Sequence, residues 1–267
     1  MVTQYGFTPK FEVFYERPYF SPNSDHGIGA FASIILNKNI PYSTFENELR
    51  FYEHPKFVRK RFRFGIQHLK RQGIYGFHTT ELKYNLNTIG DTVARLNPDY
   101  FLDGETKQQF LTASYTYTHS KVDNRSYPLE GNFAEATISK RGLPGLTDVD
   151  QVSISARYNQ YFDLGKNFYF GAQALGKTKF GKSYPYFNER GLGYCQDIVR
   201  GYELFVIDGQ HFLVYKTNLK RKLFDFVIKN PIIKSEMFAK IPIAVYLKSH
   251  VDFGYVWDNQ YFEQNPL

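Results

Sequence analysis

Apolar and polar residues alternate with a period of two along much of the chain, whereas a helical period of 3.6 is hardly seen. In one such segment, Phe62, Phe64 and Ile66 alternate with basic and polar residues. Alternation of this kind predicts β-strands with one apolar face and one polar face. The clearest examples are residues 62–68, 110–119, 152–159, 168–174 and 241–254.

Clusters of Gly, Pro, Asn and Asp separate the alternating segments and predict turns. They include residues 21–27, 123–131, 141–145 and 163–167. The segments between such clusters amount to roughly eleven to thirteen strands. Because no linker, low-complexity tract or helix-sized amphipathic segment interrupts the pattern, we predict one continuous antiparallel β domain.

Two all-β folds produce this alternation, a soluble sandwich and a transmembrane β-barrel. A sandwich turns its polar face to water and covers the apolar face with a second sheet, whereas a membrane barrel puts the apolar face in lipid and the polar face in its lumen. Here the apolar face is rich in aromatic residues, and aromatic side chains gather near segment ends, as at Tyr158, Phe162, Tyr255 and Trp257. These features favour the transmembrane barrel and leave the soluble β fold as the alternative.

The composition agrees with a folded chain that has no membrane helix. The 26 Phe and 22 Tyr among 267 residues exclude a disordered chain. The mean hydropathy is −0.45, and the longest apolar runs fall well short of the ~18 residues that a membrane helix needs. We read no signal peptide at the N-terminus, and the single Cys195 excludes a disulfide within the chain.

The chain is basic, with a net charge of +7 and a pI near 9.2, which favours anionic partners such as nucleic acid, acidic lipid or lipopolysaccharide. Its densest basic cluster comprises Lys56, Arg59, Lys60, Arg61 and Arg63, with aromatic residues interleaved. Nucleic-acid binding is one interpretation of this cluster. A band of Lys and Arg at a membrane interface explains the same residues. We favour the band and expect no nucleic-acid partner.

The P-loop template G-x-x-x-x-G-K-[ST] is matched twice in tandem, first with Lys177 and Thr178 and then with Lys182 and Ser183. A working P-loop opens a helix. The first match lies inside an alternating segment, and Pro185 opposes a helix after the second. We therefore interpret these residues as a Gly- and Lys-rich extracellular loop.

The histidines show no spacing typical of a metal site. His250 and Asp252 share one face of a predicted strand and offer a metal-ligand or catalytic pair, but a polar lumen produces such pairs routinely. No G-x-S-x-G nucleophile elbow occurs in the sequence. We predict no catalytic residue, no metal and no cofactor.

Three short motifs follow one another along the chain. Residues 123–131 match D-x-R-x-x-P-x-x-G, residues 199–202 read V-R-G-Y, and residues 251–254 match x-D-x-G. In this order the motifs resemble those of the BamA superfamily of outer-membrane barrels, also called the bacterial surface antigen family. That superfamily includes TamA-like proteins and the translocators of two-partner secretion.

The resemblance implies an internal loop and a periplasmic turn. Arg200, on a loop folded back into the barrel beside Gly201 and Tyr202, would meet Asp252, whose strand parity directs it into the lumen near Gly254. A bidentate Arg–carboxylate pair in a partly dehydrated lumen fixes orientation, and Gly201 would let the backbone turn sharply. The periplasmic turn would be shaped by Asp123, Arg125, Pro128 and Gly131.

The resemblance also implies how the chain is organised. Members of this kind close a sixteen-stranded barrel that POTRA repeats precede, and an open sheet edge is costly in lipid. We therefore expect residues 1–267 to be part of an outer-membrane barrel domain. The POTRA repeats and the closing strands would be absent, and the chain would be a fragment of a longer one.

The function that the resemblance implies is assembly or insertion of other outer-membrane proteins, without enzymatic chemistry. Expected partners are outer-membrane lipids, lipopolysaccharide, client outer-membrane proteins and lipoproteins of an assembly complex. The alternatives are a two-partner-type secretion translocator, or a barrel that anchors an enzyme domain lying outside this chain. A soluble β-rich protein that binds nucleotides or nucleic acid is the alternative from another class.

Overall fold

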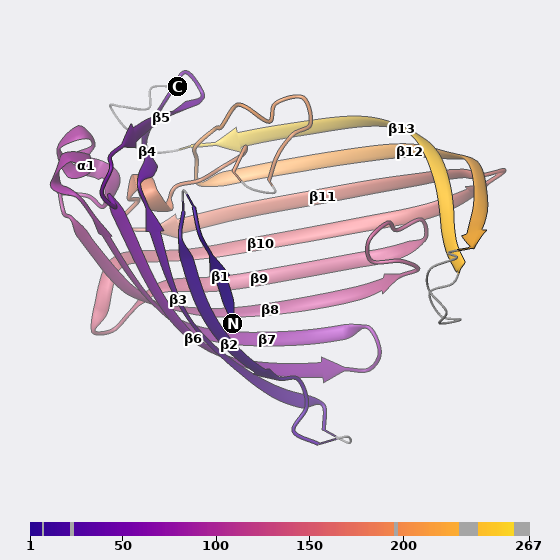
Figure 1. The fold of residues 1–267 in the computed structure, drawn as a ribbon, viewed down its shortest axis with the longest axis horizontal. Helices are drawn as coiled ribbons and strands as arrows, with labels where there is room; N and C mark the ends of the chain where they lie inside the picture. Colours follow the sequence, from indigo (N-terminus) through magenta and orange to yellow (C-terminus); the bar gives the residue numbers. More distant parts are fainter. Residues whose placement is uncertain (7, 22–23, 195–196, 230–239, 259–267) are drawn as a thin grey trace.

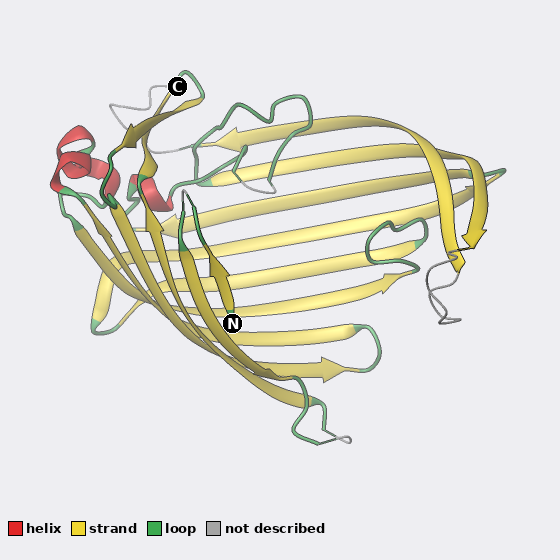
Figure 2. Ribbon diagram, viewed as in Figure 1, coloured by secondary structure: helices red, strands yellow, loops and turns green. Residues whose placement is uncertain are grey.

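The computed structural model describes residues 1–6, 8–21, 24–194, 197–229 and 240–258. Cys195 and the last nine positions lie outside these ranges. Most of the described chain forms antiparallel strands (Figure 2). The helical segments are α1 (Asp91–Leu96) and two 3-10 turns, η1 (Pro98–Tyr100) and η2 (Tyr186–Asn188). Among the described residues, no helix has the length and apolar character needed to span a membrane.

One sheet of 11 strands dominates the molecule, and each strand pairs with its neighbours in an antiparallel sense (Figure 1). Its edge strands are β1 and β13, and the sheet is strongly curved but not closed within the described residues. The predicted antiparallel β-barrel architecture is confirmed, as a partial barrel. In order across the sheet, the strands are β1 (Val2–Gln4), β2 (Lys10–Arg17), β3 (His26–Asn37), β6 (Arg59–Gln72), β7 (Gly76–Ile89), β8 (Lys107–Val122), β9 (Gly131–Leu143), β10 (Leu146–Gly165), β11 (Phe168–Gly181), β12 (His211–Lys229) and β13 (Lys240–Trp257).

The registers keep the alternation in phase across many strands. Between β10 and β11, pairing runs without a shift from Gln151 opposite Gly181 to Asp163 opposite Tyr169. The two strands are joined at Lys166 and Asn167, both in the left-handed region with φ of 53° and 66°. Two successive residues with positive φ match the twist of a tight hairpin, so the turn expected in residues 163–167 is present.

The two faces of the sheet differ in polarity. Apolar side chains on the outer, convex face have no protein cover: Phe64 is 47% exposed and Ile154 is 44% exposed. Side chains of the opposite parity face the concave side, where loops cover polar groups such as Gln108 and Gln151 almost completely. In the described part of the chain, no second sheet covers the convex face, so the sandwich alternative is not supported.

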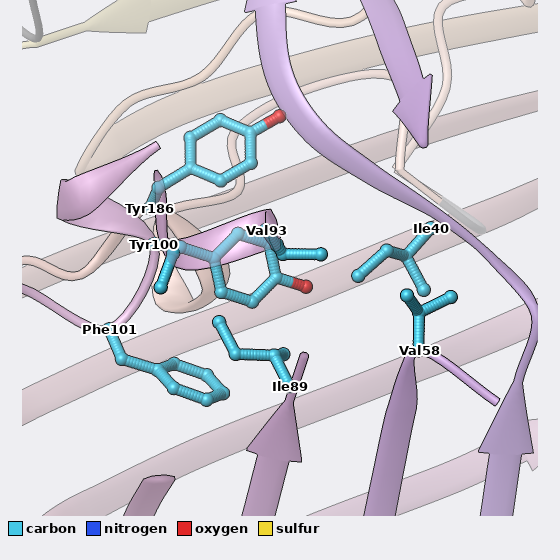
Figure 3. Close-up of a cluster of buried hydrophobic side chains, with 8 residues drawn as sticks. Ile40, Val58, Ile89, Val93, Tyr100, Phe101 and Tyr186 are labelled. Atoms are coloured by element: carbon cyan, nitrogen blue, oxygen red, sulfur yellow. The ribbon is translucent and has the colours of Figure 1, made fainter. Parts of the chain in front are cut away.

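The two ends of the sheet differ in the length of their connections. Short turns join β6 to β7 and β10 to β11 at one end. The other end carries a hairpin of β4 (Asn39–Phe45) and β5 (Glu48–Glu53), α1 and the long connection from β11 to β12. A small apolar core holds this end together (Figure 3), formed by Ile40, Val58, Ile89, Val93, Ala94, Tyr100, Phe101 and Tyr186.

Candidate functional site

The connection from β11 to β12 is described over residues 182–194 and 197–210, which lie against the concave face of the sheet; we call these residues the internal loop. The 3-10 turn η2 begins the inward path, and the Nε2 group of Gln108 on β8 donates to Asn188 at 3.0 Å. Farther along, Leu192 and Ile207 form an isolated antiparallel bridge that closes the loop on itself. The backbone N–H of Val206 donates to the carbonyl of Asn47 in the β4–β5 hairpin at 2.8 Å.

Arg200 in the internal loop binds Asp252 on β13, the pair that the sequence motifs bring together. The Arg200 Nε group donates to Asp252 Oδ2 at 2.7 Å, and the Nη2 group donates to Oδ1. The backbone N–H of Arg200 donates to the same Oδ2 atom at 3.1 Å. The remaining guanidinium nitrogen donates to Asn218 Oδ1 on β12 at 2.7 Å. The carboxylate thus accepts a bidentate fork and a backbone bond, which fixes the orientation of the loop.

The position of Asp252 on its strand explains why the pair is shielded from water. Its neighbours Val251 and Phe253 point outward and are 72% and 57% exposed, whereas the Asp252 side chain is 2% exposed. Reduced contact with water strengthens an ion pair relative to one at a surface. The position of the loop therefore depends on this ion pair, because moving the loop away would separate Arg200 from Asp252.

Gly254 makes room for the same loop two residues further along β13. A Cβ atom built on Gly254 would lie 2.6 Å from Val199 Cγ2 and 2.8 Å from Leu192 Cδ1. Val199 packs with Val256 against a buried apolar cluster of Leu175, Leu192, Phe212 and Val214. The x-D-x-G motif thus combines a polar anchor with a gap in the strand surface that the loop fills.

Gly201 and Tyr202 form the turn that follows Arg200. Gly201 has a φ of +92°, a conformation that favours glycine, and its N–H donates to Glu203 Oε1 at 3.0 Å. Tyr202 is 64% exposed and contacts the ring of Phe205, with 6.1 Å between centroids. The tyrosine therefore does not take part in the buried contacts of the pair.

A second polar anchor, which the sequence patterns did not reveal, holds the start of the internal loop. Lys179 on β11 and Glu189 are 1% and 2% exposed, with 3.4 Å between Lys179 Nζ and Glu189 Oε2. Gln151 Nε2 donates to the other carboxylate oxygen of Glu189 at 2.9 Å. Burial raises the pKa of Glu189, although the nearby Lys179 ammonium opposes the shift. Neither residue belongs to the three sequence motifs, so no pattern in the sequence pointed to this contact.

The internal loop and the β4–β5 hairpin are also joined by a buried carboxylate. Asp208 accepts hydrogen bonds from the hydroxyl groups of Thr44, at 2.5 Å, and Tyr194. The Thr44 hydroxyl also lies 2.9 Å from the hydroxyl of Tyr186. Burial raises the pKa of Asp208 despite these bonds. Asp208 therefore holds the internal loop to the β4–β5 hairpin.

The predicted turn at residues 123–131 lies between β8 and β9. Asp123 accepts backbone N–H groups from Leu129 at 2.9 Å and Glu130 at 3.2 Å. Burial opposes ionisation of this carboxyl, but the backbone donors outweigh it and lower its pKa. Gly131 has a φ of +99°, and a Cβ atom there would lie 1.9 Å from the Lys121 carbonyl oxygen. Two of the motif's residues thus have direct roles in turn geometry.

The same turn folds inward and touches β12. The Pro128 carbonyl accepts a hydrogen bond from Lys220 Nζ at 2.8 Å, and that ammonium lies 4.0 Å from the centre of the Tyr127 ring. Arg125 is exposed and lines a cavity of about 510 Å³ together with Arg157. Pro128 therefore contributes through its carbonyl, whereas Arg125 makes no hydrogen bond within the described residues.

The interpretation of the basic cluster as a membrane-interface band is wrong for its arginines. Arg59, Arg61 and Arg63 share the parity of the concave face, and Arg59 is only 6% exposed. The Arg59 side chain donates to Asn37 at 3.2 Å and to the Tyr100 hydroxyl at 2.9 Å. Only Lys60, exposed beside the apolar outer positions of β6, fits the predicted band among the cluster's β6 residues. The alternation along β6 already indicated this placement, because the arginines and the phenylalanines take turns along the strand and so lie on different faces of the sheet.

The P-loop matches lie in an extended strand. The first match and most of the second belong to β11, which ends at Gly181; only Lys182 and Ser183 begin the internal loop. The interpretation as a loop is therefore wrong for the first match, and an extended strand lacks the cradle of backbone N–H groups that holds phosphate. His250 is exposed on the concave side of β13, and in the described residues no three His, Cys, Asp or Glu side chains converge on a common metal position.

Comparison with known proteins identifies the fold. No family model matches the sequence, and no curated protein is detectably similar to it. The crystal structure of BamA from Haemophilus ducreyi lacking POTRA domains 1-3 matches with a TM-score of 0.65 and 14% identity, over 94% of this chain and 50% of that one. The chain thus spans about half the length of that BamA chain. At this identity the likeness shows a BamA-like barrel fold.

Proposed function

We propose that this chain acts in the bacterial outer membrane as a BamA-like barrel that helps other outer-membrane proteins to insert. The observation that supports this most directly is the internal loop anchored by Arg200 to Asp252. The V-R-G-Y and x-D-x-G motifs resemble those of the BamA superfamily, and their residues meet at this contact. A loop fixed on the concave face partly fills the barrel interior and leaves the sheet free to act from its outer side.

The convex face supports a position in lipid. Apolar and aromatic side chains cover it, as at Phe64, Ile154 and Phe253, each more than 40% exposed. A face of this kind is unfavourable in water, and strands can span a membrane only when their backbone groups are paired within a sheet. We therefore place the sheet across the outer membrane, in contact with lipid and lipopolysaccharide.

The proposed action involves no covalent chemistry. In the family that the motifs resemble, client strands pair with the barrel by β-augmentation, in which backbone groups at a strand edge receive a new strand. The chain would lower the barrier to insertion by templating strands, with assembly lipoproteins as further partners. The internal loop would keep the interior ordered while the client strands assemble.

An insertion assay in liposomes tests the proposal. The full chain is reconstituted into liposomes, an unfolded outer-membrane protein is added, and its folding is followed by gel mobility. We expect faster folding than in empty liposomes and loss of most of the acceleration in Asp252→Ala. The matched control is Asp225→Ala, which removes an exposed carboxylate paired with Lys222 at 2.9 Å and should keep the acceleration.

Three results would contradict the proposal. Equal folding rates with and without the chain would exclude an insertion role. Transfer of the added protein into the protease-protected liposome interior, without formation of a barrel, would favour a secretion translocator. Recovery of the chain from cells in the soluble phase without detergent would favour a soluble β protein.

A further inference from the structure

The concave face carries an indentation of about 400 Å³ whose walls are strongly basic; we call it the basic cavity. Six cationic side chains line it, and they come from four different strands and from the internal loop. They are Arg61, Arg63, Lys83, Arg141, Lys177 and Arg190. No carboxylate is among its lining residues. The cavity therefore gathers positive charge from distant parts of the sequence.

Among the described residues, only Lys83 of these six cations forms a salt bridge, although the Glu189 carboxylate lies near enough to Arg141 and Lys177 to favour their charged forms. Lys83 pairs with Glu81 at 2.5 Å, and Arg141 donates to the neutral amide of Gln151 at 3.1 Å. The Nε groups of Arg61 and Arg63 are buried and have no hydrogen-bond partner among the described residues. A buried charged donor that lacks a partner is costly, and like charges this close repel one another. A bound anion would remove both costs.

The other groups in the cavity suit an oxyanion. Arg190 lies over the rings of Phe187 and Tyr194, at 5.7 and 5.2 Å from their centres. Stacking uses the flat face of a guanidinium and leaves its N–H edge available. The Thr112 hydroxyl also lines the cavity; it accepts a hydrogen bond from Asn85 Nδ2 at 3.1 Å, which leaves its own proton free to donate to a ligand. A phosphate group has several acceptor oxygens and more than one negative charge. Several guanidinium groups together with a hydroxyl donor therefore suit a phosphate better than a single carboxylate.

We propose that the basic cavity binds a phosphate-bearing ligand, either a small soluble phosphate compound or the phosphate headgroup of a lipid. The cavity volume is within the range typical of small-molecule sites, roughly 300–1,000 Å³. The ligand would bridge Arg61 and Arg63 on β6 to Arg190 on the internal loop. Binding would thereby strengthen the attachment of the loop to the wall of the sheet opposite β13.

Calorimetric titration of the folded full chain with pyrophosphate, in neutral detergent at low ionic strength, tests this site. We expect saturable binding at one site. Arg61→Gln/Arg63→Gln should weaken it by about tenfold or more, because charge-assisted hydrogen bonds are lost. Lys60→Gln/Lys70→Gln removes the same charge from exposed positions of the same strand and should leave the affinity unchanged. Arg190→Gln serves as a second variant if the double arginine variant does not fold.

A second titration, with a short-chain phosphatidic acid, separates the two sources of phosphate. Binding of pyrophosphate alone indicates a soluble ligand, and binding of the lipid alone or far more tightly indicates a headgroup. The proposal is wrong if neither probe binds saturably, or if the two charge-matched double variants weaken binding equally. Insertion activity in liposomes is a separate readout, so failure of this site and failure of the proposed function are distinguishable.

Discussion

The convex and concave faces of the sheet are built from the same strands but follow opposite rules. On the convex face large apolar side chains are exposed, as Phe253 shows at 57%. On the concave face charged groups are buried, as Lys179 shows at 1%. A soluble protein has the reverse arrangement. The polar face thus obtains its partners from loops of the same chain, whereas no described segment covers the apolar face, whose exposure to water is unfavourable.

Loss of the buried ion pair between Lys179 and Glu189 should cause the largest decrease in the stability of the fold. Lys179→Met leaves the Glu189 carboxylate buried with Gln151 as its remaining partner. Removing one member of a buried ion pair costs about 4 kcal/mol. Urea unfolding of the chain in lipid vesicles would measure this loss.

The double variant Lys179→Met/Glu189→Met tests the ion-pair explanation, because it removes both members of the pair and should recover most of the stability.

The stability that Glu189 contributes depends on pH in a definite direction. Burial raises the pKa of Glu189 above its ordinary value of 4.5, so its contribution to stability is present below about pH 4.5 and is lost as the pH rises. The deficit of Lys179→Met should therefore shrink on acidification. A double variant as unstable as the single one would contradict the ion-pair explanation.

A charge on the convex face should have the next largest effect. Ile154→Arg places a guanidinium among the exposed apolar residues of the convex face, and at the proposed position near the middle of the bilayer it should cost about 3 kcal/mol. The control is Thr118→Arg, which puts the same side chain on the concave face. Thr118 lines the cavity of about 510 Å³ and pairs in register with Glu135. Unfolding measurements that gave equal costs for the two variants would remove the distinction between the faces.

The alternation in the sequence was enough to predict the two faces, because strand parity alone decides which side chains share a face. The motifs likewise brought Arg200 and Asp252 together. The basic cluster was misplaced because its composition was considered without the alternation of the strand. That alternation puts Arg61 and Arg63 on the concave face and Phe62 on the convex face. The anchor of Lys179 and Glu189 could not be predicted, since it depends on the path of a long loop that no local pattern specifies.

Filling the gap in β13 should have a moderate effect. Gly254→Ala would place a methyl group against Val199 and Leu192, at 2.6 and 2.8 Å, and overpacking of this kind costs about 2 kcal/mol. We expect the internal loop to become more accessible to protease. Gly176→Ala is the matched control, because its nearest contacts at 3.8 Å are ordinary. Equal protease sensitivity in the two variants would show that Gly254 is not needed to seat the loop.

The smallest effect is expected at Asp123, which lies in a turn and belongs to neither face. Its pKa is lowered because backbone donors outweigh the cost of burial. Its contribution is therefore present above the ordinary value of 3.8 and is lost as the pH falls through the lowered pKa. Solvent screening limits that contribution to about 1 kcal/mol or less. Hydrogen exchange at the Leu129 and Glu130 amides should show protection that falls on acidification, and Asp123→Ala, which removes the acceptor oxygen, should have little protection at any pH. Protection in the native chain that did not change with pH would mean that the turn is held by its contact with Lys220 instead, and thus by the concave face after all.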